Sequence, residues 1–417
     1  MENRDPARPG PGPATRLLHP DAGTFAWGAT LPPVFQTSAF CRETAEEMEA
    51  QFAGKAPGFL YTRLGNPTVA AFEAAMCEAE GGVMAAACAS GSAAIAVTLM
   101  NLLSAGDEIV SASGVYGGTL DLFRDLAPFG VRVKYVDRLT EETLAAAIGE
   151  RTKAVFAEAV SNPGLRVLDV ATAAKAAHGR GVPLIVDATT VTPALLRPLE
   201  YGADIVIHSS SKYINGNGSA ISGVIVDGCA FPWNADRFPA LGEYLRYGKG
   251  AFSARLKNAV WRDIGACLSP VNAFLNLTGL ETLCLRMERI SENALRLARF
   301  LEEKGVPARY PGLASHPDHA IAARQMTGGM AGGVITLRTG SRGAAFRLLN
   351  ALKYAKLVSN IGDTKTLAIH PASTIFAHAS PEQKRSAGVY DDLVRVSVGL
   401  ENAEDLIADF ENALKAV

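Results

Sequence analysis

The fold of this chain is decided by the stretch Ile205-Val206-Ile207-His208-Ser209-Ser210-Ser211-Lys212-Tyr213-Ile214-Asn215-Gly216-Asn217-Gly218. Consecutive β-branched residues without polar alternation are typical of a strand that is covered on both faces, as in a parallel sheet. The run ends in hydroxyl residues, a lysine and strand-breaking glycines. A cationic side chain at the end of a buried strand requires a partner or a task, because desolvating it is costly.

Similar runs recur on both sides of this stretch, and helical patterns separate several of them. We predict strands at 83–89, 108–112, 131–136, 154–158, 184–186, 205–207 and 221–226, with helices at 66–80, 90–103, 140–148 and 171–180. Alternation of strands and helices predicts an α/β domain with a mainly parallel sheet. Beyond it we expect an irregular aromatic segment over 229–253, one long helix over 272–303, strands at 333–337 and 394–398, and helices at 342–352 and 403–414.

These patterns predict a division of the 417 residues into four parts. Residues 1–15, rich in Pro and Gly, are expected to form a disordered leader, and residues 16–65 an N-terminal arm. Residues 66–260 would form the α/β domain, and 261–417 a smaller α+β C-terminal domain.

The composition excludes several classes of protein. A net charge of −2 gives no reason to expect a nucleic-acid or membrane partner. No run of eighteen apolar residues predicts a membrane-spanning helix, and the N-terminus lacks the apolar core of a signal peptide. The six cysteines form no CxxC pair, so we expect reduced thiols, no metal site and a cytoplasmic location.

Two residues at strand ends suggest the chemistry. Lys212 can hold an aldehyde cofactor as a Schiff base, and Asp187, which ends the preceding strand, can pair with a protonated ring nitrogen. That pairing fits pyridoxal 5′-phosphate (PLP), whose ring must withdraw electrons. An Asp that caps the next helix, and a Lys that reaches solvent from a strand end, are the alternatives.

A phosphate site is predicted where a strand turns into a helix at Ser90-Gly91-Ser92, because backbone N–H groups and the helix dipole attract anions there. Ser209 and Ser211 could add hydroxyl donors. The alternative is an ordinary turn of small residues and a serine-rich loop, neither of which binds a ligand.

Tyrosine and arginine residues complete the predicted constellation. Tyr116, in a glycine-rich loop, could stack on the cofactor ring and exchange protons, or simply pack. Arg63, two residues after Tyr61, is suited to a phosphate, although a solvated loop Arg is the alternative. Arg395, inside an apolar strand, requires an anion, either a substrate carboxylate or an internal Asp or Glu.

Together these segments resemble the Cys/Met-metabolism family of PLP-dependent enzymes, over about residues 15–417. The resemblance implies fold type I, the aspartate-aminotransferase-like fold. It implies that Lys212 is the Schiff-base lysine, Asp187 the partner of the pyridine nitrogen, and Tyr116 the stacking and acid–base tyrosine. The phosphate would be bound by Gly91, Ser92, Ser209 and Ser211, and by Tyr61 and Arg63 of a neighbouring subunit. Asn162, Asn360 and Arg395 would hold the substrate.

Within the family, the segments 262–270, 279–283 and 359–367 are most similar to the O-acetylhomoserine sulfhydrylase branch. That branch implies γ-replacement on an O-acyl-L-homoserine by sulfide or a small thiol, in a homotetramer with active sites shared across a dimer interface. Gly118 stands where methionine γ-lyases usually carry a cysteine, which argues against methionine γ-lyase activity. The chain departs from the sulfhydrylase pattern at Ala188, Asn217 and Phe376, which leaves the substrate and nucleophile open.

Three other functions compete with this prediction. γ-Elimination, by a methionine or cystathionine γ-lyase, and replacement of the cystathionine γ-synthase type use the same cofactor. A non-enzymatic α/β binding protein is the third alternative, and it would show no cofactor absorbance.

Overall fold

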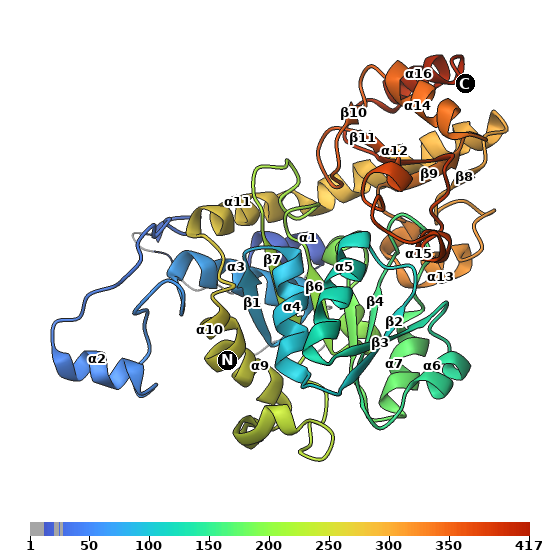
Figure 1. The fold of residues 1–417 in the computed structure, drawn as a ribbon. Helices are drawn as coiled ribbons and strands as arrows, with labels where there is room; N and C mark the ends of the chain where they lie inside the picture. The colour runs from blue at the N-terminus through green and yellow to red at the C-terminus, as the bar shows by residue number, and fades with distance from the viewer. Residues whose placement is uncertain (1–11, 21–24, 26–27) are drawn as a thin grey trace, which may run out of the picture.

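The computed structural model describes residues 12–20, 25 and 28–417, and it contains a large α/β domain and a smaller α+β domain (Figure 1). The first eleven residues, most of the predicted leader, lie outside the described part. Residues Pro13–Leu18 form helix α1, so the last residues of the expected disordered leader are helical instead.

The large domain contains a seven-stranded sheet in the order β1-β7-β6-β5-β4-β2-β3. Strands β3, β2, β4, β5 and β6 are parallel, and β7 runs antiparallel to its neighbours β6 and β1. The mainly parallel sheet predicted from the apolar runs is therefore confirmed. The strands are β1 Met84–Cys88, β2 Glu108–Ala112, β3 Arg132–Val136, β4 Thr152–Glu158, β5 Leu184–Asp187, β6 Ile205–His208 and β7 Gly223–Asp227.

Helices cover both faces of this sheet, which explains why its inner strands are mainly apolar, whereas the edge strand β3 contains Arg132 and Lys134 and is largely exposed. Alternate residues of one strand enter different cores: Val206 joins the cluster that contains Phe72 of α3, whereas Ile205 and Ile207 join the cluster that contains Ile95 of α4. The helices of this domain are α3 Pro67–Glu80, α4 Gly91–Leu102, α5 Gly117–Leu126, α6 Glu141–Ala147, α7 Val170–His178 and α8 Thr192–Leu195.

The segment that follows β7 closes one of these two cores. Phe231, Trp233 and Phe238 form an aromatic cluster, in which Trp233 stacks on Phe252 with ring centroids 5.8 Å apart. This confirms the expected aromatic packing segment, although short helical turns run through it. They are η4 Pro239–Gly250, α9 Ala251–Arg255, the π turn η5 Leu256–Val260 and α10 Trp261–Ile264.

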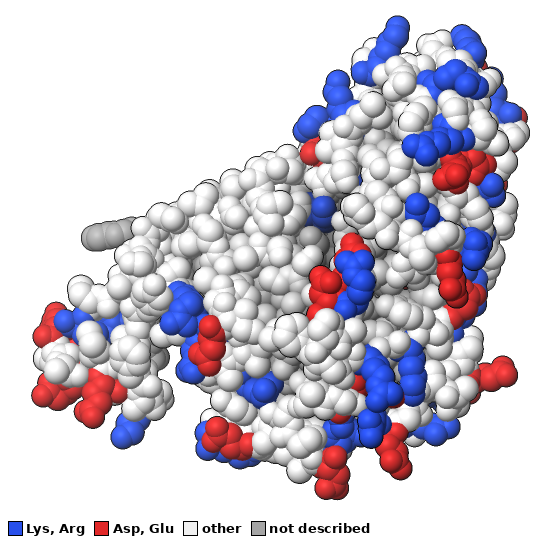
Figure 2. Space-filling model, viewed as in Figure 1, with Lys and Arg blue, Asp and Glu red and all other residues white. Residues whose placement is uncertain are grey.

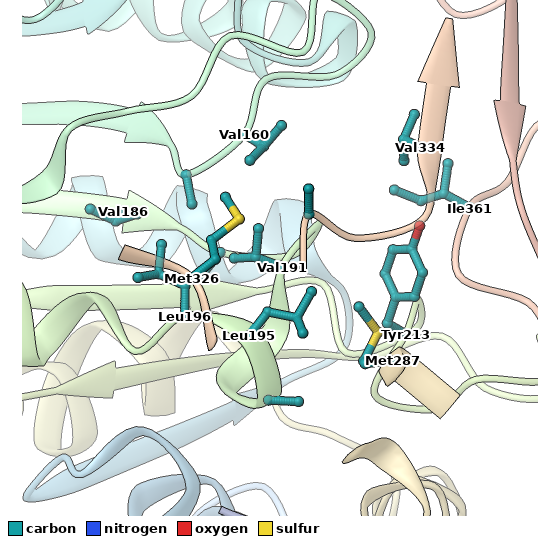
Figure 3. Packing of buried hydrophobic residues seen from close by; sticks show 14 of the residues in the cluster. Val160, Val186, Val191, Leu195, Leu196, Tyr213, Met287, Met326, Val334 and Ile361 are labelled. Atoms are coloured by element: carbon teal, nitrogen blue, oxygen red, sulfur yellow. The ribbon is translucent and has the colours of Figure 1, made fainter. Parts of the chain in front are cut away.

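The small domain has a five-stranded sheet in the order β10-β11-β12-β9-β8. Its strands are β8 Ala308–Arg309, β9 Val334–Arg338, β10 Lys356–Leu357, β11 Leu367–Ile369 and β12 Leu393–Ser397, and its helices are α12 Leu283–Glu303, α13 His319–Gln325, α14 Arg342–Ala351, α15 Pro381–Ser386 and α16 Ala403–Leu414. Its core is continuous with that of the large domain. Figure 3 shows Tyr213 beside Met287, with its ring directed toward Val334 and Ile361.

The single long helix predicted over 272–303 is in fact two helices, α11 Pro270–Glu281 and α12. Thr282 between them has non-helical angles (φ −106°, ψ 6°). The guanidinium of Arg286 explains the break, because its Nη2 donates to the Gly279 carbonyl at 2.6 Å and its Nη1 to that of Tyr213 at 2.5 Å. This tertiary contact ties the junction to the turn after β6.

The predicted start of the second domain, residue 261, lies too early. Trp261 is buried and donates from Nε1 to the Ala87 carbonyl of β1 at 2.9 Å, and α11 packs against α3. Residues 261–281 therefore belong to the large domain by packing, and the small domain begins with α12.

The N-terminal arm extends away from the body of the protein and carries helix α2, Ala45–Phe52, at its tip (Figure 1). No residue of α2 is buried. On the face drawn in Figure 2, acidic and basic side chains are intermingled rather than gathered by sign. Among the described residues, none of the helices has the length and apolar character that crossing a membrane requires.

Candidate active site

One cavity of about 230 Å³ lies at the carboxyl ends of β4, β5 and β6, where the two domains meet. In an open α/β sheet this is the usual place for a ligand. The cavity brings together ten of the twelve predicted site residues, namely Gly91, Ser92, Tyr116, Asn162, Asp187, Ser209, Ser211, Lys212, Asn360 and Arg395.

Lys212 enters the cavity from the turn that follows β6. Its Nζ donates to Asn360 Oδ1 at 2.5 Å. Burial, together with the charge of Arg395, lowers the pKa of the Lys212 amine from 10.5 to about 8. A larger fraction of the amine than in an ordinary lysine is therefore uncharged near neutral pH, and this is the form that attacks an aldehyde or accepts a proton.

Two carboxylates end neighbouring parallel strands beneath the cavity. Asp187 of β5 is paired in register with Glu158 of β4. Burial raises the pKa of Asp187, and hydrogen bonds from Thr189, whose N–H lies at 2.9 Å, partly offset this rise. A buried carboxylate in this position is suited to a cation supplied by a ligand.

A phosphate cradle is formed by the first turn of α4 and the turn after β6. The Ser90 side chain caps α4 by accepting from the Ala93 N–H at 3.0 Å, which leaves the N–H groups of Gly91 and Ser92 at the positive end of the helix dipole. A Cβ at position 91 would lie 2.6 Å from Ser209 Cβ, so only glycine allows this approach. Ser211 lines the cavity, but its hydroxyl already donates to the Ser222 carbonyl at 2.9 Å.

Arg395 lies inside β12 and is 3% exposed. Its Nη1 donates to Asn162 Oδ1 at 3.2 Å and its Nη2 to the Asn360 carbonyl at 2.9 Å. Its Nε is buried and has no hydrogen-bond partner among the described residues. Burial lowers the pKa of Arg395 to about 10, and the group remains cationic at neutral pH. No carboxylate pairs with it in the described chain, which favours a substrate anion over the internal pair considered above.

Tyr116 reaches the cavity from the loop between β2 and α5, and burial raises the pKa of its hydroxyl. Its backbone N–H donates to Glu158 Oε1 at 2.6 Å. The hydroxyl is therefore protonated at neutral pH and available as a donor.

Tyr61 and Arg63, in contrast, lie outside this cavity. Tyr61 is 43% exposed, and Arg63 stacks over its ring at 5.6 Å and donates to the Arg262 carbonyl at 2.6 Å. The single chain therefore does not bring this pair to the phosphate cradle.

None of the three residues that depart from the sulfhydrylase pattern lines the cavity. Ala188 is fully buried, and Phe376 is 1% exposed within a core cluster, whereas Ile375 beside it faces the cavity. Asn217 accepts a hydrogen bond from the Ser219 N–H at 3.1 Å, in the turn after Lys212. We find no direct effect of these three side chains on the cavity wall.

Several residues of the cavity wall were not among the predicted site residues, and Glu158 is the most important of them. Thr189, Thr190, Ser359 and Ile375 are others. The position of Glu158 at the end of an apolar strand was the same signal that identified Asp187, and it could have been found in that way.

The residues of this cavity fit PLP. They provide an amine for the aldehyde, a buried carboxylate for the ring nitrogen, an aromatic ring at the wall, and helix N–H groups for a phosphate. Among the described residues no cluster of His, Cys, Asp and Glu could hold a metal ion.

Comparison with known proteins agrees with this chemistry. An O-acetyl-L-homoserine sulfhydrylase 1 of Thermus thermophilus is 42% identical over 398 residues, covering 92% of this chain and 94% of that protein. An L-methionine gamma-lyase of Pseudomonas putida is 39% identical over 416 residues, covering 97% and 98%. A solved structure of a protein described as an O-acetylhomoserine (thiol)-lyase from Campylobacter jejuni is 33% identical, with a TM-score of 0.92, and covers 97% of this chain and 99% of that one.

That structure carries a pyridoxyl-lysine phosphate, and PLP is the cofactor of the family. The family model for Cys/Met metabolism PLP-dependent enzymes matches residues 14–415. On the cavity, the fold and these matches, the chain belongs to the Cys/Met-metabolism family of PLP-dependent enzymes.

Proposed function

We propose that this enzyme catalyses γ-replacement on O-acetyl-L-homoserine by sulfide or a small thiol. The Cγ–O bond breaks and acetate leaves with its electron pair. A Cγ–S bond forms, and the thiol proton is released, so that sulfide gives L-homocysteine and a small thiol gives its thioether homologue. The observation that carries the proposal is the convergence of Lys212, Tyr116 and Arg395, which meets no carboxylate among the described residues, on one cavity whose residues fit PLP.

When bound, PLP withdraws electrons from the substrate and makes its Cα proton acidic. Lys212 is the group that removes this proton and then one from Cβ, because its amine has a pKa of about 8 and lies in the cavity. Arg395 binds the substrate carboxylate, and its contacts with Asn162 and Asn360 hold the guanidinium plane in place. The Tyr116 hydroxyl, protonated at neutral pH, donates a hydrogen bond to the acetate oxygen as the Cγ–O bond breaks.

Replacement rather than elimination is supported by the environment of Gly118. A Cβ at this position would lie only 2.7 Å from Tyr116 Cε1. The cysteine that we expect of a methionine γ-lyase here would therefore displace the tyrosine ring from its present place. Elimination remains the second candidate because of the similarity to the Pseudomonas putida lyase.

We also propose a cytoplasmic homotetramer, a dimer of dimers in which the arm of one subunit completes the site of its neighbour. Tyr61 and Arg63 are exposed on an arm that extends from the body, and neither reaches the cavity of its own chain (Figure 1). A neighbouring phosphate would give Arg63 a charged partner in place of a backbone carbonyl.

A product assay tests the reaction. The purified enzyme, loaded with PLP, is incubated with O-acetyl-L-homoserine and sulfide, methanethiol or no nucleophile, and homocysteine, methionine and 2-ketobutyrate are measured. We expect the thiol products to exceed ketobutyrate when a nucleophile is present. Ketobutyrate as the main product with every nucleophile would assign the enzyme to elimination. O-succinyl-L-homoserine in parallel determines the acyl group.

A further inference from the structure

Glu158 is a buried carboxylate that no step of the proposed reaction uses. It is the last residue of β4, is 9% exposed, and borders the active-site cavity. Both of its oxygens accept hydrogen bonds from backbone N–H groups: Oε1 from Tyr116 at 2.6 Å and Oε2 from Asn162 at 3.0 Å. One side chain therefore joins two loops.

Each of these loops carries a side chain that faces the ligand. The first lies between β2 and α5 and presents Tyr116. The second follows β4 and presents Asn162, whose Oδ1 accepts from Arg395 Nη1 at 3.2 Å. Since Tyr116 and Asn162 are far apart in the chain, Glu158 sets their relative position directly, and the position of Arg395 through Asn162.

We propose that Glu158 is a positioning residue, which holds the Tyr116 and Asn162 loops in the geometry that the reaction requires. The proposal rests on the proposed function only for the identity of the substrate. Glu158 acts through backbone groups and does not itself exchange a proton with substrate.

The electrostatics of the site support a role beyond simple filling of the core. Burial and the adjacent Asp187 raise the pKa of Glu158 to about 8, while the two N–H donors lower it. A hydrophobic side chain would avoid this cost if only packing were needed. A bound ligand cation on Asp187 would remove part of the repulsion and favour the ionised form, which accepts from both loops.

The test compares Glu158→Gln and Glu158→Asp with a matched control, Glu108→Gln. Gln keeps the shape of the side chain but offers only one oxygen acceptor, and Asp is one methylene too short to reach both N–H groups. Glu108 is also buried (8% exposed), but it begins β2 at the amino ends of the parallel strands, away from the cavity, and there it pairs with Lys134 at 2.7 Å. Neither replacement side chain is larger than Glu, and Glu158 also borders a second cavity of about 210 Å³, so we expect no steric clash in either variant.

We expect the PLP-loaded Glu158→Gln enzyme to fold, to show an altered visible circular dichroism band of the cofactor, and to lose roughly 100-fold in kcat/KM. Glu108→Gln should keep the wild-type band and activity. In a Tyr116→Phe background, Glu158→Gln should cost at least about tenfold less than it does in the wild type, because both changes act on the same group.

Three results would overturn the proposal. The first is a wild-type dichroism band with wild-type kinetics in Glu158→Gln, and the second is a double variant in which the two losses of kcat/KM multiply. The third is failure of both Glu158 variants to fold, which would assign the residue to stability. The dichroism signal requires no O-acetylhomoserine. A wild-type enzyme without sulfhydrylase activity would therefore refute the proposed function and leave this test intact.

Discussion

Replacing Gly118 with alanine should separate activity from stability. A Cβ at this position would lie 2.7 Å from Tyr116 Cε1, 3.3 Å from Cδ1 and 3.5 Å from Cζ. Carbon atoms in contact prefer about 3.5–4.0 Å, so the ring must move by about 1 Å. The Tyr116 side chain is 39% exposed and free to move in that way. A misplacement of this size at a reacting group costs about 100-fold in rate.

Stability should respond in the opposite direction. Gly118 is the second residue of α5, and alanine in place of glycine in a helix is favourable by up to about 1 kcal/mol. The Gly118→Ala enzyme should therefore unfold at a temperature equal to or above that of the wild type while its kcat falls. Gly149→Ala is the matched control, because its Cβ would meet its nearest neighbour, Lys134 Nζ, at an ordinary 3.6 Å.

The assay is steady-state formation of homocysteine from O-acetyl-L-homoserine and sulfide, with thermal unfolding followed by far-UV circular dichroism. A kcat within twofold of the wild type in Gly118→Ala would refute the reasoning about the ring. An equal loss of activity in Gly118→Ala and in the control Gly149→Ala would show that the loss does not come from the contact with the Tyr116 ring.

Other perturbations have distinct expected outcomes. Lys212→Ala should abolish turnover and the visible absorbance of bound PLP, and retention of full turnover would contradict the assignment. Arg395→Leu should weaken use of substrate by on the order of 2–5 kcal/mol in kcat/KM, because a buried charged partner is lost; an unchanged kcat/KM for O-acetylhomoserine would exclude a contact with its carboxylate. Arg63→Ala and Lys212→Ala enzymes, each inactive alone, should regain activity when unfolded together and refolded as hybrids, since only a shared site combines their intact halves. In the folded, PLP-free protein the pKa of Lys212 is lowered from 10.5 to about 8. Between pH 8 and pH 10.5 the Lys212 amine is therefore protonated in the unfolded chain and mostly deprotonated in the folded protein. The free energy of unfolding of the wild type relative to Lys212→Met should then rise by up to ~3 kcal/mol from pH 8 to 10.5 in urea titrations, and a constant difference would refute the shift.

Much of the large domain could be predicted because its signals are local. Every strand from β1 to β7 was predicted to within a few residues, and for the inner strands the reason is that a strand buried on both faces shows no polar alternation. The edge strand β3 alternates instead, as a half-exposed strand does. The predicted helix at 66–80 is confirmed as α3, where the Asn66 side chain accepts from the Thr68 N–H and Pro67 occupies the first turn.

The incorrect predictions concern positions where a contact with a residue far away in the chain sets the local structure. The break at Thr282 depends on Arg286 reaching the Tyr213 carbonyl, which no helical pattern encodes. The large domain extends beyond the predicted domain boundary at residue 261, because the Trp261 indole N–H donates to a carbonyl of β1. The strand-end position of Glu158 is readable in the sequence, but its contacts are not, because the two N–H groups that it binds approach only after folding.

The sequence by itself determined the α/β class and the PLP cofactor, and it predicted Lys212 and Asp187 as residues that hold it, because strand ends, charges and small-residue turns are readable along the chain. Only the tertiary structure decided which of the candidate residues meet. It placed ten of them around one cavity and left Tyr61 and Arg63 outside it. It also shows that Ala188, Asn217 and Phe376 do not line the cavity. The physical reason is that a binding site is a set of distances between residues far apart in the chain, and those distances are set by how the sheet, its helices and the small domain pack together.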